Sequence, residues 1–131
     1  MPADCSHFRI VQSWPVHCVA GTPGASFHPE LDVAGIEAVF SKGAHAAAYS
    51  GFEGAAPDGR ALAGWLRAHG VGTVDVVGIA TDHCVRATAL DAARAGFATT
   101  VLLGLTAGVA PSTVDAALTE LRSAGVVVDG R

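Results

Sequence analysis

Hydrophobic and polar positions follow two different periods along the second half of the chain. Val74–Ala80 and Ala98–Leu105 are short, almost unbroken apolar runs, the pattern of strands covered on both faces of a parallel sheet. The stretches after these two runs carry apolar residues at helical spacing and end at Gly96 and Gly125. Strand and helix therefore alternate at short spacing. This alternation predicts βαβ crossovers and a three-layer α/β/α domain with a parallel sheet.

Capping and turn residues set the expected bounds of the other elements. In the first half, the pattern predicts a strand over Ile36–Gly43, a loop over Ala44–Pro57, and a helix over Gly59–Arg67 that is capped by Asp58 and ended by Gly70. In the second half, it predicts a helix to Ala95 that is capped by Thr81 or Asp82, and a turn over Gly108–Pro111. A helix from Ser112 or Thr113 to Ala124 and a strand over Val126–Val128 follow. Residues 1–35 contain four prolines and are expected to be mostly irregular. A chain of 131 residues is sufficient for one domain, 1–131, in which residues 36–131 form the alternating part.

Composition narrows the class of partner. Half of the residues are hydrophobic but only 6% are aromatic, so the core is built from small aliphatic side chains. The net charge is −4 and no basic cluster occurs, which argues against nucleic acid and anionic membranes as partners. No apolar run approaches the ~18 residues that a membrane helix needs, and the first residues lack the basic and apolar regions of a leader. We expect a cytoplasmic protein that acts on a small molecule.

Two residues combine a reactive side chain with a place at the carboxyl ends of predicted strands, where open parallel sheets bind ligands. Cys84 falls in the first turn of the helix after Val74–Ala80, where unpaired backbone N–H groups stabilise a thiolate and can bind an oxyanion. Lys42, the only lysine beside seven arginines, closes the strand before. The alternatives to a functional site are that Cys84 is an inert buried thiol and that Lys42 is an ordinary solvated side chain. Cys5 and Cys18 lack such a setting, and no Cys-x-x-Cys motif occurs.

The histidines are less informative by spacing alone. A structural role is favoured for His17, whereas loop or surface positions are expected for His28, His45 and His69. His83 directly precedes Cys84, and consecutive side chains on a helix splay apart. We therefore expect His83 to line the pocket or brace the backbone, and not to act as the base for the thiol.

One long segment resembles a known family. Gly78-Ile79-Ala80-Thr81-Asp82-His83-Cys84-Val85-Arg86-Ala87-Thr88-Ala89 is similar to the nucleophile segment of bacterial nicotinamidases, also called pyrazinamidases, which are cysteine hydrolases of the isochorismatase-like superfamily. Four further segments match in the same order, namely Ser13–Ala25, Ala38–Gly43, Tyr49–Glu53 and Leu105–Val109. Isochorismatases proper lack the nucleophilic cysteine, which this chain has as Cys84.

The resemblance implies a set of catalytic roles. Cys84 corresponds to the nucleophile that attacks the carboxamide carbon, expels ammonia and leaves a thioester for water to hydrolyse. Lys42 corresponds to the lysine that stabilises the thiolate and the developing charge. The backbone N–H groups of Ala80 and Cys84 correspond to the oxyanion hole. The bond between Ile79 and Ala80 falls where the family has a non-proline cis peptide.

The resemblance also implies a substrate pocket and a metal. Trp14, Tyr49 and His83 correspond to residues around the aromatic ring of the substrate. His17 corresponds to a ligand of the divalent metal (Zn, Fe or Mn) that holds the pyridine nitrogen, which replaces the structural interpretation given above. His7 is matched to a second ligand, in a segment that only partly follows the family pattern.

Two family motifs are absent from the sequence. Asp-x-Gln-x-Asp-Phe, whose first aspartate is the general base, and Asp-x-His, which supplies two metal ligands, do not occur. The resemblance therefore implies an N-terminally truncated nicotinamidase with an incomplete metal site, weak or no activity, and an exposed sheet edge through which copies could associate. The family reaction converts nicotinamide or pyrazinamide and water to the acid and ammonia in NAD salvage. The alternatives are an amidase for another small carboxamide and a non-catalytic fragment.

Overall fold

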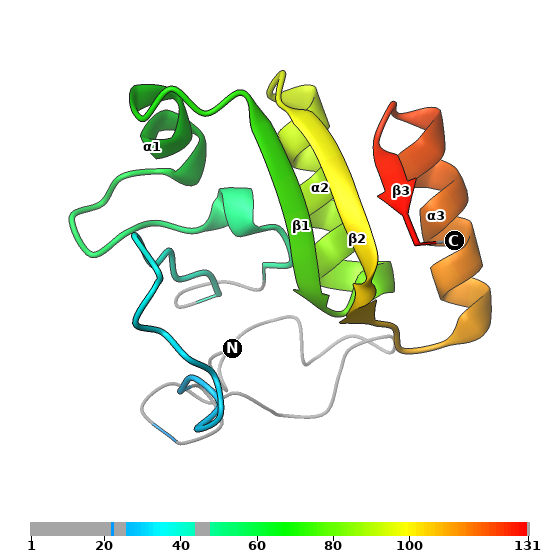
Figure 1. Cartoon of the computed structure of the whole chain (residues 1–131), viewed down its shortest axis with the longest axis horizontal. Helices are drawn as coiled ribbons and strands as arrows, with labels where there is room; N and C mark the ends of the chain where they lie inside the picture. The colour runs from blue at the N-terminus through cyan, green and yellow to red at the C-terminus, as the bar shows by residue number, and fades with distance from the viewer. Residues whose placement is uncertain (1–21, 23–25, 44–47, 131) are drawn as a thin grey trace.

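The computed structural model describes residues 22, 26–43 and 48–130. Its helices and strands, in chain order, are η3 (Gly51–Glu53), α1 (Leu62–Ala68), β1 (Thr73–Ile79), η4 (Thr81–Val85), α2 (Arg86–Arg94), β2 (Ala98–Ala107), α3 (Pro111–Ser123) and β3 (Val127–Asp129) (Figure 1). η3 is a single 3₁₀ turn, and η4 is a short π-helix that runs directly into α2.

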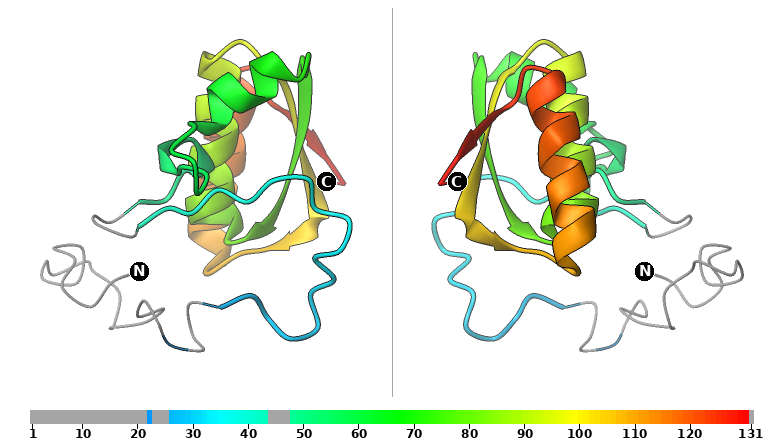
Figure 2. Two further views of the ribbon diagram at one scale, coloured as in Figure 1. Left: turned by 90° about the vertical axis from the view of Figure 1, so that its left-hand side faces the viewer. Right: turned by 90° about the vertical axis from the view of Figure 1, so that its right-hand side faces the viewer.

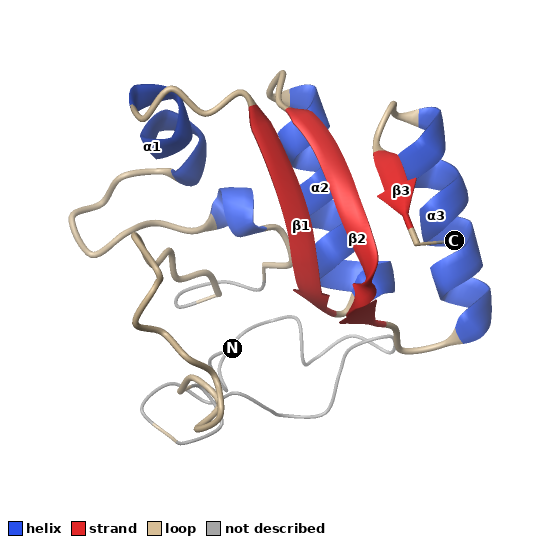
Figure 3. Ribbon diagram, in the orientation of Figure 1, coloured by secondary structure: helices blue, strands red, loops and turns tan. Residues whose placement is uncertain are grey.

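The three strands form one parallel sheet in the order β1-β2-β3 (Figure 3). Thr73 pairs with Ala98 at the start of β1, and Thr100 pairs with Val127 at the start of β3. The register between β1 and β2 shifts at Gly78. Its φ of +115° is a conformation that glycine adopts readily and that costs free energy for other residues. The predicted α/β architecture with parallel strands and intervening helices is confirmed.

α2 and α3 pack on one face of the sheet (Figure 2) and enclose the core. The core consists of Val76, Val85, Ala89, Leu90, Val101, Leu118, Leu121 and Val126. The strand side chains that point to the other face of the sheet are exposed to solvent. Val77, Ile79 and Val127 are 49%, 77% and 59% exposed. The prediction that β1 is covered on both faces is therefore wrong within the described residues, because its apolar run is packed on the helical side alone.

The predicted strand over Ile36–Gly43 is also wrong. Its only ladder contact is an isolated antiparallel bridge in which Ser41 and Ala55 exchange two backbone hydrogen bonds of 2.9 and 3.0 Å. Val39 is exposed, so the apolar residues of this segment face no neighbouring strand along its length. A strand needs a partner edge as well as an apolar pattern, and a single loop residue does not supply one.

Helix starts differ from prediction more than helix ends do. α1 begins at Leu62, and the Asp58 carboxylate instead accepts the N–H of Arg60 in the turn before it. The residue before η4 is Ala80, so neither Thr81 nor Asp82 caps its own helix. α3 begins at Pro111 behind Ala110, which also has no capping side chain. The predicted ends are confirmed, with Gly70, Gly96 and Gly125 at positive φ.

The described part of the N-terminal region agrees with the expectation of irregular structure. Residues 26–40 contain turns and bends but no helix or strand. The expected loop over Ala44–Pro57 contains the η3 turn, and residues 44–47 lie outside the described part. None of the described helices has the length and apolar character that crossing a membrane requires.

Candidate active site

Cys84 lies in η4, between the carboxyl end of β1 and the start of α2, which is where the sequence pattern put it. Its thiol is free and half-buried. The bond between Ile79 and Ala80 is cis, as the resemblance implied. The carbonyl of Ala80 accepts the N–H groups of His83 (3.1 Å) and Val85 (3.0 Å), which folds the turn around the cysteine.

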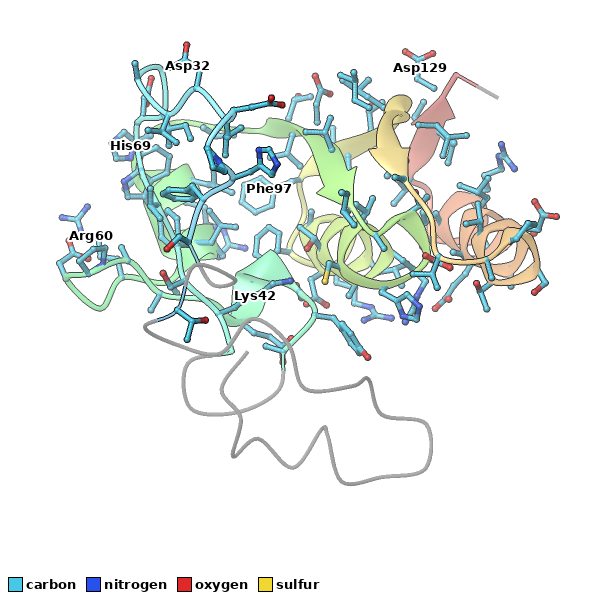
Figure 4. The ribbon with its side chains drawn as sticks, turned by 90° about the horizontal axis from the view of Figure 1, so that it is seen from below. Asp32, Lys42, Arg60, His69, Phe97 and Asp129 are labelled. Carbon is cyan, nitrogen blue, oxygen red and sulfur yellow. The ribbon has the colours of Figure 1, made fainter. Side chains whose placement is uncertain are left out.

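Lys42 and two aromatic rings connect to this turn through a chain of contacts. The half-buried ammonium of Lys42 donates to the backbone carbonyl of Tyr49. The Tyr49 ring lies 5.6 Å from the imidazole of His83, tilted by 35°. Figure 4 shows Lys42 beside the η3 turn. Lys42, Tyr49 and His83 are thus gathered at the turn that carries Cys84.

The loop that carries Tyr49 is held by two sets of hydrogen bonds. Ser50 and Glu53 form a capping box around η3, in which Glu53 accepts the N–H groups of Tyr49 (3.2 Å) and Ser50 (3.1 Å). The hydroxyl of Thr88 on α2 accepts the N–H of Gly51 at 2.9 Å. Sequence reasoning missed Glu53 and Thr88. The Ser-x-x-Glu spacing is a local signal that could have found the first, whereas the second contact is between distant segments.

Asp82 is the other residue whose place the sequence did not reveal. Its side chain is buried, and its carboxylate accepts the N–H groups of Val109 (3.0 Å) and Ala110 (3.2 Å) and the hydroxyl of Thr113. Burial alone would raise the pKa of Asp82, but these hydrogen bonds outweigh burial and lower the pKa to about 2. Its partners lie 27 to 31 residues further along the chain, so no local pattern indicates them.

Several predicted site residues lie outside the described residues, namely Trp14 of the expected pocket and His17 and His7 of the expected metal site. Cys5, Cys18 and His45, for which no site role was predicted, lie outside them too. Within the described ranges, no group of three or more His, Cys, Asp or Glu residues could hold a metal ion. His28 and His69 are exposed, as expected, and His69 stacks on Trp65 with ring centres 3.9 Å apart.

This arrangement has a nucleophile and hydrogen-bond donors, two of the parts that acyl transfer uses. A thiol at a helix start can attack a carbonyl carbon, and backbone N–H groups of the same turn can bind the oxygen that becomes negative. The ammonium of Lys42 supplies positive charge, and the Tyr49 and His83 rings offer surfaces for a flat ligand. These are the properties of an amidase or esterase site with a cysteine nucleophile.

Comparison with known proteins identifies the family. The isochorismatase domain matches residues 5–130. The nicotinamidase/pyrazinamidase of Mycobacterium tuberculosis is 65% identical over 114 residues, which cover 87% of this chain and 61% of that protein. The nicotinamidase of Acinetobacter baylyi is 44% identical over 93 residues, which cover 69% of this chain and 44% of that protein.

Solved structures agree in fold. PnC1 from L. infantum, in complex with nicotinate, has a TM-score of 0.83 at 38% identity, covering 97% of this chain and 66% of that one. The pyrazinamidase of Pyrococcus horikoshii, in complex with zinc, has a TM-score of 0.74 at 36% identity, covering 99% of this chain and 70% of that one. The chain spans 61% of the length of the M. tuberculosis relative. On the match over residues 5–130, the chain belongs to the isochorismatase family, and the relatives described here are nicotinamidases and pyrazinamidases.

Proposed function

We propose that the chain is a nicotinamidase-type amidohydrolase, with the overall reaction nicotinamide plus water to nicotinate plus ammonia. The observation that carries the proposal is the place of Cys84 at the start of the α2 segment, in the same turn as His83, which connects through the Tyr49 ring to Lys42. The 65% identity to the M. tuberculosis nicotinamidase/pyrazinamidase supports the substrate class, as does the nicotinate bound in the L. infantum structure.

The proposed steps use residues of this chain alone. The Cys84 sulfur attacks the carboxamide carbon, forming a C–S bond while the C=O electron pair moves onto oxygen. Backbone N–H groups of Ala80 and Cys84 bind that oxyanion, and the ammonium of Lys42 stabilises the thiolate beforehand. The thiol proton passes to water, the C–N bond breaks, the nitrogen takes a proton back from water and leaves as ammonia, and a thioester remains. Water adds to the thioester carbon, the C–S bond breaks, and nicotinate and the thiol are released.

The aromatic residues would orient the substrate ring. The rings of Tyr49 and His83, 5.6 Å apart, are the proposed contacts of the substrate ring, and the family resemblance assigns Trp14 to the same role. The family resemblance assigns His17 and His7 to a divalent metal, and the P. horikoshii relative is a zinc complex. The described residues contain no metal-holding group, and none of the steps above depends on one.

Proton transfer is the weak step of this chain. The sequence has no Asp-x-Gln-x-Asp-Phe motif to supply the family's general base. Asp82 does not replace it, because both of its oxygens accept hydrogen bonds from the α3 segment and its pKa is lowered to about 2. A carboxylate of such low proton affinity is a poor base at neutral pH. We expect acylation of Cys84 to be slow and multiple turnover to be weaker still.

The experiment measures acylation and turnover separately on the full 131-residue chain. Intact-protein mass spectrometry follows the thioester on Cys84 at neutral and mildly alkaline pH, while an enzyme-coupled assay follows released ammonia. The amides are nicotinamide, pyrazinamide and acetamide, and the variants are Cys84→Ala and, as a control on the same helix, Asp91→Asn. We expect acylation by the two aromatic amides in the parent chain and in Asp91→Asn, and none in Cys84→Ala.

Two outcomes contradict the proposal. Preferential acylation by acetamide would favour an amidase for other small carboxamides. A folded chain that none of the three amides acylates, at either pH, would favour a non-catalytic fragment.

A further inference from the structure

The carboxylate of Asp82 joins the cysteine turn to a different part of the fold. Oδ1 of Asp82 accepts the N–H of Val109 at 3.0 Å, and Oδ2 accepts the N–H of Ala110 at 3.2 Å and the hydroxyl of Thr113. Val109 and Ala110 directly precede α3, and Thr113 is in its first turn. The side chain of Asp82 therefore holds the two residues before this helix and the hydroxyl of its first turn.

The helix beside this carboxylate favours its ionised form, because the positive end of the α3 dipole faces it. The Nε2 atom of His83 lies 3.9 Å from Oδ2. Arg86 makes a second link, since its Nε donates to the backbone carbonyl of Asp82 at 3.3 Å and its Nη1 pairs with Glu120 of α3 at 3.1 Å. Half of the Glu120 side chain is exposed, whereas the Asp82 side chain is fully buried. Asp82 is thus the stronger of the two links.

We propose that Asp82 is a positioning residue for Cys84, whose carboxylate fixes the Thr81–Val85 turn, and with it the thiol and its neighbouring N–H groups, against the start of α3. The proposal rests on the proposed function only in taking Cys84 as the nucleophile. Asp82 and Cys84 belong to the same five-residue π-turn, so a shift of the first changes the backbone that carries the second. The anion is held by three donors of the α3 segment, and these bonds fix its place relative to the thiol two residues away.

Substitution of Thr113 tests this link without removing the charge. Thr113→Val takes one donor from the carboxylate and weakens its hold on the turn that carries Cys84. Thr113→Ser keeps the hydroxyl and serves as the rescue variant. Thr119→Val on the same helix is the matched control, because the hydroxyl of Thr119 bonds only to the carbonyl of Asp115 one turn earlier.

The readout is the reactivity of the Cys84 thiol, which does not require catalysis. Iodoacetamide alkylation is followed across pH at a temperature where circular dichroism shows each variant to be folded, and peptide mass spectrometry separates Cys84 from Cys5 and Cys18. We expect alkylation of Cys84 at neutral pH to be slower by about threefold in Thr113→Val, because the thiol is held less well in the turn. Thr113→Ser and Thr119→Val should keep the parental profile.

A role in stability alone gives a different result. Thr113→Val would then lower the melting temperature while the folded protein keeps the parental Cys84 profile, and this outcome overturns the proposal. Asp82→Asn, which removes the charge and at least one of the three hydrogen bonds, is the second variant. An unchanged Cys84 profile in folded Asp82→Asn overturns the proposal equally. A shifted profile in a chain that no amide acylates would support the positioning role and contradict the proposed function, so the two remain separable.

Discussion

At the scale of single residues, Asp82 shows how a buried carboxylate makes folding depend on pH. Its pKa is lowered from 3.8 to about 2 in the folded chain, because the donors of the α3 segment outweigh the cost of burial. A depressed pKa means that the carboxylate stabilises the fold fully above its unfolded-state pKa. That stability is lost as the pH falls through the folded-state pKa.

The expected effect is a stability loss of about 2 kcal/mol between roughly pH 4 and pH 2 that is specific to this residue. Asp82→Asn should flatten the acid limb of a plot of unfolding free energy against pH, as measured by urea denaturation. It should also be less stable than the parent at neutral pH. Asp91→Asn is the control, since Asp91 makes only a 3.5 Å surface ion pair with Arg94. Equal acid limbs in the parent and Asp82→Asn would contradict the assignment of the hydrogen bonds to a charged group.

The sequence indicated Cys84 and Lys42 because each carries its own signal. Cys84 follows an apolar run that predicts a strand, and Lys42 is the only lysine beside seven arginines. Asp82 was predicted as a cap of its own helix and Thr88 was not predicted at all, because both side chains act on segments far away in the sequence. Contacts of that kind depend on the fold, and residue type and spacing do not specify them.

At the scale of elements, the two ends of each helix differed in predictability for a physical reason. Helices end where glycine adopts a positive φ, and that preference belongs to the residue itself. Helices begin where some group satisfies the first N–H donors, and here α1 and α3 begin without a capping side chain of their own. The segment 36–43 has the apolar content of a strand but only one bridge to Ala55, because strand formation depends on a partner.

The η3 turn offers a test at this scale. Thr88→Val replaces the hydroxyl that accepts the Gly51 N–H by a methyl group of similar size and leaves that donor without its partner. We expect a loss of about 1 kcal/mol. The amide of Gly51 should also exchange faster with deuterium, as NMR or mass spectrometry would measure, and the Tyr49 loop should be less tightly held on α2.

Thr119→Val is again a suitable control, because it removes a threonine hydroxyl that bonds within its own helix. Its effect on Gly51 exchange should be negligible. Unchanged protection of Gly51 in Thr88→Val would show that the capping box of Ser50 and Glu53 holds the turn without α2.

At the scale of the whole molecule, the uneven coverage of the sheet is the dominant feature. Helices cover one face, whereas Val77, Ile79 and Val127 expose apolar surface on the other. β1 is an edge strand of the described sheet, since it pairs only with β2. Apolar faces and unpaired strand edges both favour association.

We therefore expect the purified chain to self-associate in a concentration-dependent way. Val77→Lys and Val127→Lys together should shift the population toward monomer in sedimentation velocity, because each places a charge on the open face. Thr119→Lys adds charge at an exposed position of α3, away from the sheet, and should leave association close to that of the parent. A parent chain that stays monomeric at all accessible concentrations would contradict the expectation.

The missing local cap of α3 has a consequence for how the chain folds. Isolated helices of about 12–15 residues are marginal in water, and α3 has 13 residues. The carboxylate that completes its start comes from residue 82, on the far side of α2 and β2 in the sequence. Formation of α3 must then wait for a long-range encounter, which raises the contact order of the folding nucleus and slows its assembly. We therefore expect α3 to form as a late, cooperative partner of the β1–β2 pair and not as an early autonomous unit.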